Sequence, residues 1–203
     1  MATKFDIITQ ASISLDGNAV SSFRDDTREV EVFQPIYDRV KRSELSSYLW
    51  NFNTFTEKLA REAVTPTDGR WRYQYLPPTN LLRIVNVQDA NGFPAPYQFE
   101  TGRIFSNHEE LFAKYQRNID ESDLPVFFID VLVARLAFEA AQPLTGEARV
   151  VDRTFQKYNV MLRRARNVDT KENPAPTVID RQSTWLSAHF GGSRRYGFRR
   201  FGS

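Results

Sequence analysis

Two histidines, together with adjacent carboxylates at Asp25-Asp26 and at Glu109-Glu110, are side chains of this 203-residue chain that could do chemistry. His108 and His189 have no second His, Cys or Asp at the spacing that metal ligands take in sequence motifs. The carboxylate pairs, Asp25-Asp26 and Glu109-Glu110, lie where a helix start or a loop accounts for them. The residue types therefore predict neither a metal site nor acid–base catalysis.

Recognised catalytic motifs are missing as well. The chain has no Gly-x-x-x-x-Gly-Lys run, no Gly-x-Ser-x-Gly turn and no glycine-rich dinucleotide loop. It has no cysteine, which excludes disulfides and thiolate zinc sites. We therefore expect no catalytic residue, no metal and no cofactor, and a protein that is not an enzyme.

The C-terminal segment combines arginine with aromatic side chains. Its candidate contact residues are Trp185, Phe190, Arg194, Arg195, Tyr196, Phe198, Arg199, Arg200 and Phe201. Such residues bind nucleic acid through charge and stacking, and they also anchor protein interfaces. From the residues alone, three interpretations stay open: a protein partner, nucleic acid, or a solvated tail.

The charge balance separates this segment from the rest. Residues 181–203 hold five arginines and no acid, whereas the rest of the chain has 22 basic and 25 acidic residues. The net charge of the whole chain, +2, does not reveal this difference. The apolar fraction of 41% is ordinary for a globular protein. The most apolar stretch, residues 126–141, carries three charges and no N-terminal run resembles a signal peptide, so we expect a soluble protein with no membrane partner.

Two helices are predicted in the first fifty residues. Thr3 with Asp6 forms a capping-box pair that opens a helix ending at Asp16-Gly17-Asn18. Asp26 with Glu29 forms a second pair. It opens a helix running toward Tyr48, with apolar spacing at Val30, Phe33, Tyr37 and Val40 and a bend at Pro35.

From about residue 51 the spacing of apolar residues changes from the helical pattern to the alternation typical of strands. Trp71, Tyr73 and Tyr75 alternate with polar residues, and 82–87, 97–99 and 103–105 are short strand candidates. Asp68-Gly69, Asn91-Gly92 and Thr101-Gly102 supply the positive-φ residues of tight hairpins. Residues 51–120 therefore predict an antiparallel insert of four to six strands.

Two more helices follow. The first begins at Ser122-Asp123 and is buried on most sides, with an Arg135–Glu139 pair, and Pro143 and Gly146 end it. Thr145 caps the last helix, whose stripe of Val151, Phe155, Tyr158, Leu162 and Ala165 packs against a neighbour.

The prediction is thus an α+β fold, mainly α. A bundle of about four helices spans residues 1–50 and 121–169, a small antiparallel β region spans 51–120, and an extended C-terminal arm spans 170–203. The prolines at 174 and 176 favour extended backbone at the start of this arm.

Three short segments, in this order and spacing, resemble the tail tubular protein A family, the head-to-tail adaptors of tailed bacteriophages. They lie at 50–52, 75–84 and 135–146, and the resemblance covers residues 3–170. The motif residues are Trp50, Asn51, Phe52, Tyr75, Leu76, Pro77, Arg83, Leu136, Glu139, Pro143 and Gly146. Taken singly, each of these residues is explained by packing or by the end of an element.

The resemblance implies a structural virion protein at the head–tail junction, made in the host cytoplasm. Family members form a homo-oligomeric ring, commonly of twelve subunits, that docks under the portal protein and meets a tail or nozzle protein on its other side. Double-stranded DNA passes through the ring without specific binding. The C-terminal arm would grip the portal. A nucleic-acid-binding accessory protein, or another neck ring such as a stopper, remains the alternative.

Overall fold

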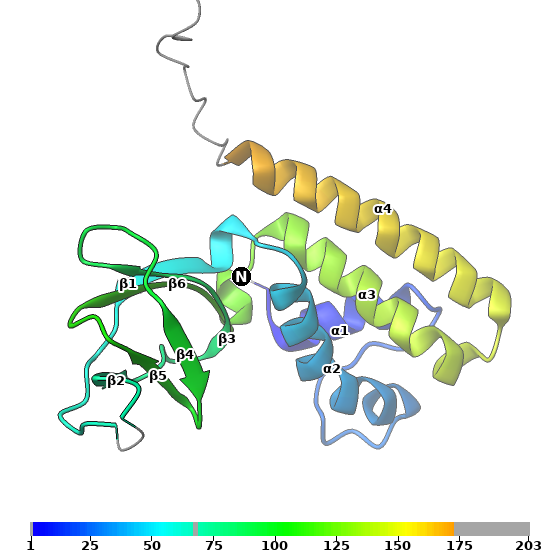
Figure 1. Cartoon of the computed structure of the whole chain (residues 1–203). Coiled ribbons are helices and arrows are strands. Elements are labelled where there is room, and N and C mark those ends of the chain that lie inside the picture. Colours follow the sequence, from blue (N-terminus) through cyan, green and yellow to red (C-terminus); the bar gives the residue numbers. More distant parts are fainter. Residues whose placement is uncertain (1, 67–68, 173–203) are drawn as a thin grey trace, which may run out of the picture. The chain divides into compact units, whose positions relative to one another are not determined.

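The computed structural model describes residues 2–66 and 69–172 (Figure 1). Within these residues it contains four α-helices and six β-strands, so the predicted mainly-α α+β class is confirmed. The predicted arm residues from 173 onward, Trp185 to Phe201 among them, lie outside the described residues. In the part that is described, no helix is long and apolar enough to cross a membrane.

Helix α1 (Lys4–Ile13) begins as the sequence predicts. The Thr3 hydroxyl accepts a hydrogen bond from the Asp6 backbone N–H at 3.2 Å, and the Asp6 carboxylate accepts one from the Thr3 N–H at 2.8 Å. These bonds satisfy two donors that a helix start leaves without partners.

Helix α2 (Arg28–Ser47) begins differently from the prediction. Its cap is Thr27, whose hydroxyl accepts from the backbone N–H of Val30, and not Asp26. Glu29 instead accepts hydrogen bonds from the backbone and side-chain nitrogens of Asn18, at 2.9 and 3.0 Å. The loop after α1 therefore uses the carboxylate that sequence reasoning assigned to the helix start. Pro35 lies inside α2, as predicted.

Helices α3 (Val126–Thr145) and α4 (Ala148–Glu172) follow the strands, and α3 corrects two predictions. Glu121–Asp123 is a short 3-10 helix, η2, and Pro125 is the N-cap of α3, so Ser122-Asp123 does not start that helix. Pro143 does not end α3 but lies in its last turn. Gly146 ends it, with a left-handed φ of 69°.

Helix α4 also differs in its face and its length. The side chains it buries are Thr154, Tyr158, Ala165 and Asp169, whereas Phe155 is 48% exposed although its ring contacts Phe138. The predicted stripe thus packs against α3, with Tyr158 and Ala165 buried and Phe155 in contact with Phe138 but half-exposed. Because α4 runs to Glu172, residues 170–172 belong to this helix and not to an extended arm.

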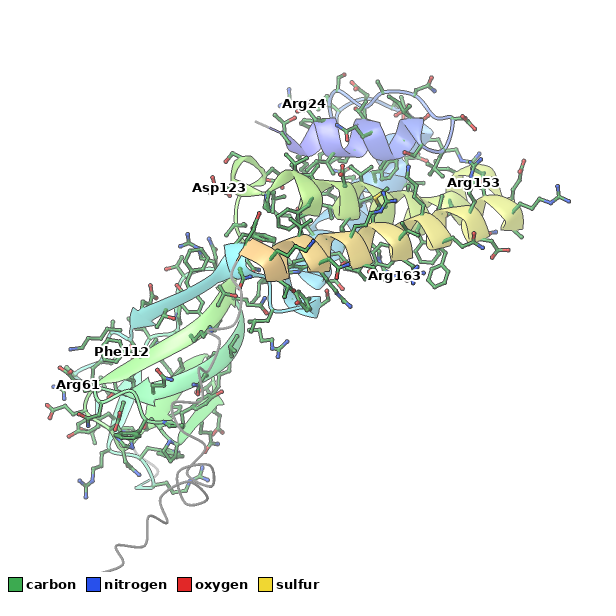
Figure 2. The ribbon with its side chains drawn as sticks, turned by 90° about the horizontal axis from the view of Figure 1, so that it is seen from above. Arg24, Arg61, Phe112, Asp123, Arg153 and Arg163 are labelled. Atoms are coloured by element: carbon green, nitrogen blue, oxygen red, sulfur yellow. The ribbon has the colours of Figure 1, made fainter. Side chains whose placement is uncertain are left out.

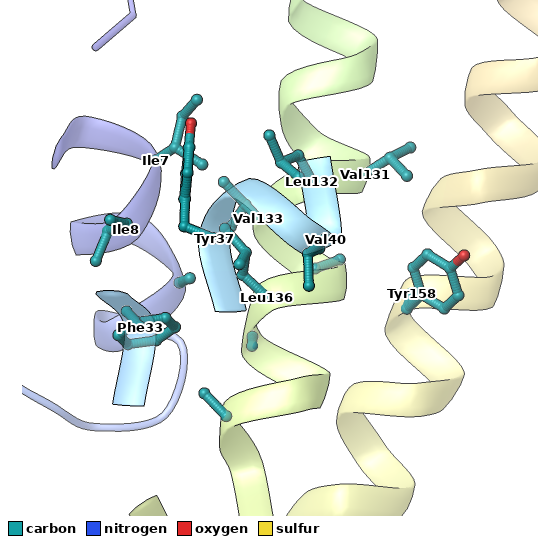
Figure 3. Packing of buried hydrophobic residues seen from close by; sticks show 14 of the residues in the cluster. Ile7, Ile8, Phe33, Tyr37, Val40, Val131, Leu132, Val133, Leu136 and Tyr158 are labelled. Atoms are coloured by element: carbon teal, nitrogen blue, oxygen red, sulfur yellow. The ribbon is translucent and has the colours of Figure 1, made fainter. Parts of the chain in front are cut away.

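Helix α3 is the centre of the bundle. Helix α4 packs on one side of it, and α1 and α2 pack on the other (Figures 1 and 3). Ile7, Phe33, Tyr37 and Leu132 meet at the α1–α2–α3 contact and are fully buried. Because α3 is covered on both sides, its sequence is apolar nearly all round.

The strands form two antiparallel sheets of three. Their bounds are β1 Thr54–Lys58, β2 Tyr73–Tyr75, β3 Leu81–Asp89, β4 Tyr97–Glu100, β5 Arg103–Ser106 and β6 Leu111–Arg117. The orders are β1-β6-β3 and β2-β5-β4. The turn between β4 and β5 has positive φ at Thr101 and Gly102, as the predicted hairpin requires.

Isolated bridges join the two sheets on both sides. Arg61 pairs with Tyr75 beyond the end of β1, and Gln88 of β3 pairs with Pro94 before β4. Strand pairing therefore closes on itself, which leaves few free edges. A second core fills the interior, with Tyr75, Ile104 and Leu111 fully buried.

Candidate interaction site

The turn between α2 and β1, which we call the elbow (residues 48–53), holds the first motif. Trp50 is fully buried, and its Nε1–H donates to the backbone oxygen of Glu44 at 3.0 Å. Its ring lies 5.3 Å from the ring of Phe128 on α3 and 5.8 Å from that of Phe52. The short 3-10 helix η1 (Asn51–Asn53) follows directly. Trp50 therefore joins the end of α2 to α3.

Asn51 connects the elbow to the end of α4. Its backbone N–H donates to the Asp169 carboxylate at 3.0 Å, and its side-chain Nδ2 donates to the Asp169 backbone oxygen at 2.7 Å. Asp169 is buried in the last turn of α4. We call this pair the α4 latch. It holds the point from which the chain continues into residue 173.

Two further contacts support the latch. The hydroxyl groups of Tyr48 and Thr170 lie 3.3 Å apart. The Arg166 guanidinium lies over the Tyr48 ring, 5.0 Å from its centroid, a cation–π geometry. Three positions on the last turns of α4 thus contact the elbow.

Asp169 gives the latch a predicted pH dependence. Burial raises the pKa of Asp169 above its ordinary value of 3.8, although the Asn51 N–H acts in the opposite direction. The folded chain therefore binds this proton more tightly than the unfolded chain does. Hence the free energy of unfolding loses a contribution as pH rises from 3.8 through the raised folded pKa, and the loss is complete at neutral pH.

Asp169→Asn keeps an acceptor for the Asn51 N–H but removes the charge. We expect it to flatten this pH dependence without lowering the free energy of unfolding at neutral pH, measured by urea denaturation across the range. Asp169→Ala, the control, removes the acceptor and should cost about 1–3 kcal/mol at every pH. If the Asn variant is as unstable as the Ala variant at neutral pH, the carboxylate charge stabilises the latch and our account is wrong.

Gln116 of β6 ties the strands to the bundle. Its Nε2 donates to the backbone oxygens of Leu45 and Tyr48, at 3.2 and 2.7 Å, and to Oδ1 of Asn53 at 3.0 Å. It is fully buried. Sequence reasoning did not single out Gln116, and no local signal marks it, because a lone glutamine gives no sign of burial.

A charged cluster lies between α2, α3 and α4. Glu44 accepts a hydrogen bond from the Tyr158 hydroxyl at 2.9 Å and lies 3.7 Å from Nε of Arg135. Arg135 pairs with Glu139 at 2.7 Å, as predicted, and Glu139 also pairs with Arg39. Burial raises the pKa of Glu44 and raises that of Tyr158 to about 12.

A buried carboxylate with a raised pKa is one mark of an active site. Here the side chain of Glu44 is only 3% exposed, and its neighbours hold it by hydrogen bonding and charge. A general acid or base must reach a substrate proton. Because Glu44 is enclosed in this way, we interpret the cluster as part of the packing between α2, α3 and α4.

The three sequence motifs do not gather into one site. Tyr75 lies inside the strand region, where its hydroxyl donates to the His108 backbone oxygen. Leu76 is exposed and Pro77 half-buried, whereas Arg83 donates to the Ser46 oxygen at 3.5 Å, near the elbow.

The third motif follows α3. Leu136 is in the bundle core, and the Pro143 backbone oxygen accepts from Arg28 at 2.6 Å. Glu139 makes the ion pairs described above, and Gly146 ends the helix. Of the three motifs, only the first contacts the end of α4.

Within residues 2–66 and 69–172, no group of three His, Asp or Glu side chains could hold a metal ion. His108 lies half-buried in the loop before β6, and His189 lies outside this range. No protein-family model matches the chain, and no curated protein matches it.

Proposed function

We propose that this chain is a structural protein of a tailed phage, which forms a ring between portal and tail and continues the DNA channel without catalysis. The observation that carries the proposal is the α4 latch. The first motif of the adaptor resemblance supplies Asn51, which holds the end of α4 beside the elbow. A folded body whose last helix is held at its end, just before an arginine- and aromatic-rich segment in the sequence, suits a protein that docks through that segment.

The charge distribution of the chain supports a role in lining a DNA channel. Outside residues 181–203 the chain has 22 basic and 25 acidic residues, a nearly neutral balance. A strongly basic channel would hold phosphates through salt-dependent contacts and slow the passage of DNA. Five arginines are instead grouped in one segment of the sequence, residues 181–203, which suits docking to a partner through charge. Many such arms in one ring would act together, so modest single affinities suffice.

Electron microscopy of the chain with its cognate portal tests the proposal. We expect rings on the portal with the full chain and none with a chain ending at Asn173, because that truncation removes the candidate docking residues but keeps every described helix and strand. The truncated chain is its own folding control, since its thermal unfolding should match that of the full chain. A full-length variant with Arg194, Arg195, Arg199 and Arg200 changed to Ser separates charge from the aromatic contacts.

Other results of this experiment would change or contradict the proposed function. Rings with both chains would keep the ring function and move portal docking to the described body. No complex with either chain would contradict the proposal. Binding of the full chain to DNA that falls steeply with salt, and is lost on deleting residues 191–203, would then favour the accessory nucleic-acid-binding function.

A further inference from the structure

Helix α4 has an exposed stripe opposite its buried side. The stripe residues are Arg149, Arg153, Val160, Arg164 and Lys171, all exposed. At 100° per residue they lie within one sector of the helix, about half a turn away from Tyr158 and Ala165. The whole helix has seven basic and three acidic residues, and one of the acids, Asp169, is buried. Its outer face is therefore basic around an apolar centre.

The other side of the bundle has the opposite charge. Residues 3–31, which form α1, the following loop and the first turn of α2, contain six acidic and three basic residues. Asp16, Asp25, Asp26 and Glu31 are exposed there, and so is Ile13, at 59%. We call residues 3–31 the acidic face.

The two faces belong to different helices but adjoin along one edge, where Ser14 and Asp16 line a hollow together with Arg153 and Lys157. Helix α3 lies between them, with α1 on one side and α4 on the other (Figures 2 and 3). In the part of the chain that the structure describes, no ion pair joins the stripe to the acidic face. Such pairs can form between copies.

We propose that the α4 stripe of one copy packs on the acidic face of the next copy, and that this contact, repeated, closes the ring. The inference rests on the proposed ring function and names the surfaces that build it. A contact between two different faces is the heterologous kind that generates rings. Two α4 stripes would repel each other, so the charge pattern also disfavours a two-fold dimer through α4. Val160 supplies apolar contact within the stripe, and exposed Ile13 supplies it at the edge of the acidic face nearest α4.

Reversing the charge of one face at a time tests the proposal. In the first variant, Arg149→Glu, Arg153→Glu and Arg164→Glu make the stripe acidic. In the second, Asp26→Lys and Glu31→Lys make the acidic face basic. All five positions are exposed, so both variants should fold like the unmodified chain, which circular dichroism checks.

Ring formation on the cognate portal is then followed by electron microscopy. Each variant alone should give no rings, because its two faces now carry the same sign. An equimolar mixture should give rings again, since each altered face meets a complementary face on the other variant. Rescue by mixing is the decisive result, because it requires these two faces to contact each other. Rings from either variant alone, or none from the mixture, overturn the inference.

The controls separate this inference from the function on which it rests. The unmodified chain must form rings in the same experiment; if it does not, the proposed function fails and not merely the choice of faces. Arg72→Glu with Lys114→Glu reverses two exposed charges in the strand region and should leave ring formation unchanged. Loss of rings in that control would show a general charge effect and would also overturn the assignment to α4.

Discussion

Replacing Trp50 with Ala is expected to lower the free energy of unfolding by about 3–5 kcal/mol. Trp50 is fully buried and contacts the rings of Tyr48, Phe52 and Phe128. Removing the indole would leave a cavity at the junction of α2, η1 and α3, and it would also remove the donor to the Glu44 backbone oxygen. Urea denaturation followed by circular dichroism measures the loss.

The neighbouring residue provides a matched control. Leu49 is 40% exposed and adjoins Trp50 in the chain, so Leu49→Ala changes the same turn without opening a core cavity. We expect a change of about 0.5 kcal/mol or less. If the two variants lose similar stability, Trp50 does not hold the elbow in the way described.

The Trp50 variant also connects stability with assembly. Because Trp50 and Asn51 are adjacent, a loosened elbow loosens the α4 latch. The variant should therefore form fewer rings on the portal, even at a temperature where most of it is folded. Normal rings from a destabilised variant would show that the latch does not position the docking segment.

Replacing Gln116 with Leu is expected to cost about 3 kcal/mol of unfolding free energy. The side chain is fully buried and donates to three oxygens of the elbow region. Leucine has nearly the same volume but no donor, so the Oδ1 atom of Asn53 loses this partner and the other two bonds are lost as well. Gln116 lies on β6, and its partners lie at the end of α2 and in the elbow. The substitution therefore weakens the contacts that join the strands to the helical bundle.

Lys114→Leu on the same strand is the control. Lys114 is exposed, and the substitution adds the same side chain without removing a buried donor. We expect a change of about 0.5 kcal/mol or less. Equal losses at positions 114 and 116 would indicate that leucine is unfavourable anywhere on β6, and the hydrogen-bond account would fail.

Features that depend on a few neighbouring residues could be predicted from the sequence. The Thr3–Asp6 capping box and the Thr101-Gly102 hairpin are both found where their residue types place them. The buried character of α3 follows from its composition, and the Arg135–Glu139 pair follows from a spacing of four. In each case the partners lie within one turn of helix or one turn of chain, so their residue types and spacing suffice to bring them together.

Features that depend on competition between local and distant partners could not be predicted. Asp26 and Thr27 are both suitable caps, and Glu29 bonds to Asn18 rather than completing a capping box. Strand β1 has no apolar alternation of its own, and its pairing with β6 joins residues far apart in the chain. Phe155 has the right spacing for burial, but the rotation of α4 on α3 leaves it half-exposed.

The sequence by itself determined the class of fold, the four helices, four of the six strands (β2 to β5), and the residues from which the adaptor resemblance was drawn. The tertiary structure decided what those residues do. It placed Asn51 beside Asp169, more than a hundred residues later, and Gln116 beside the elbow. It also set a basic α4 and an acidic α1 side on opposite sides of α3. Residue types and spacing act within a few residues, whereas the pairing of distant polar groups and the orientation of charged faces arise only when the helices and strands pack together.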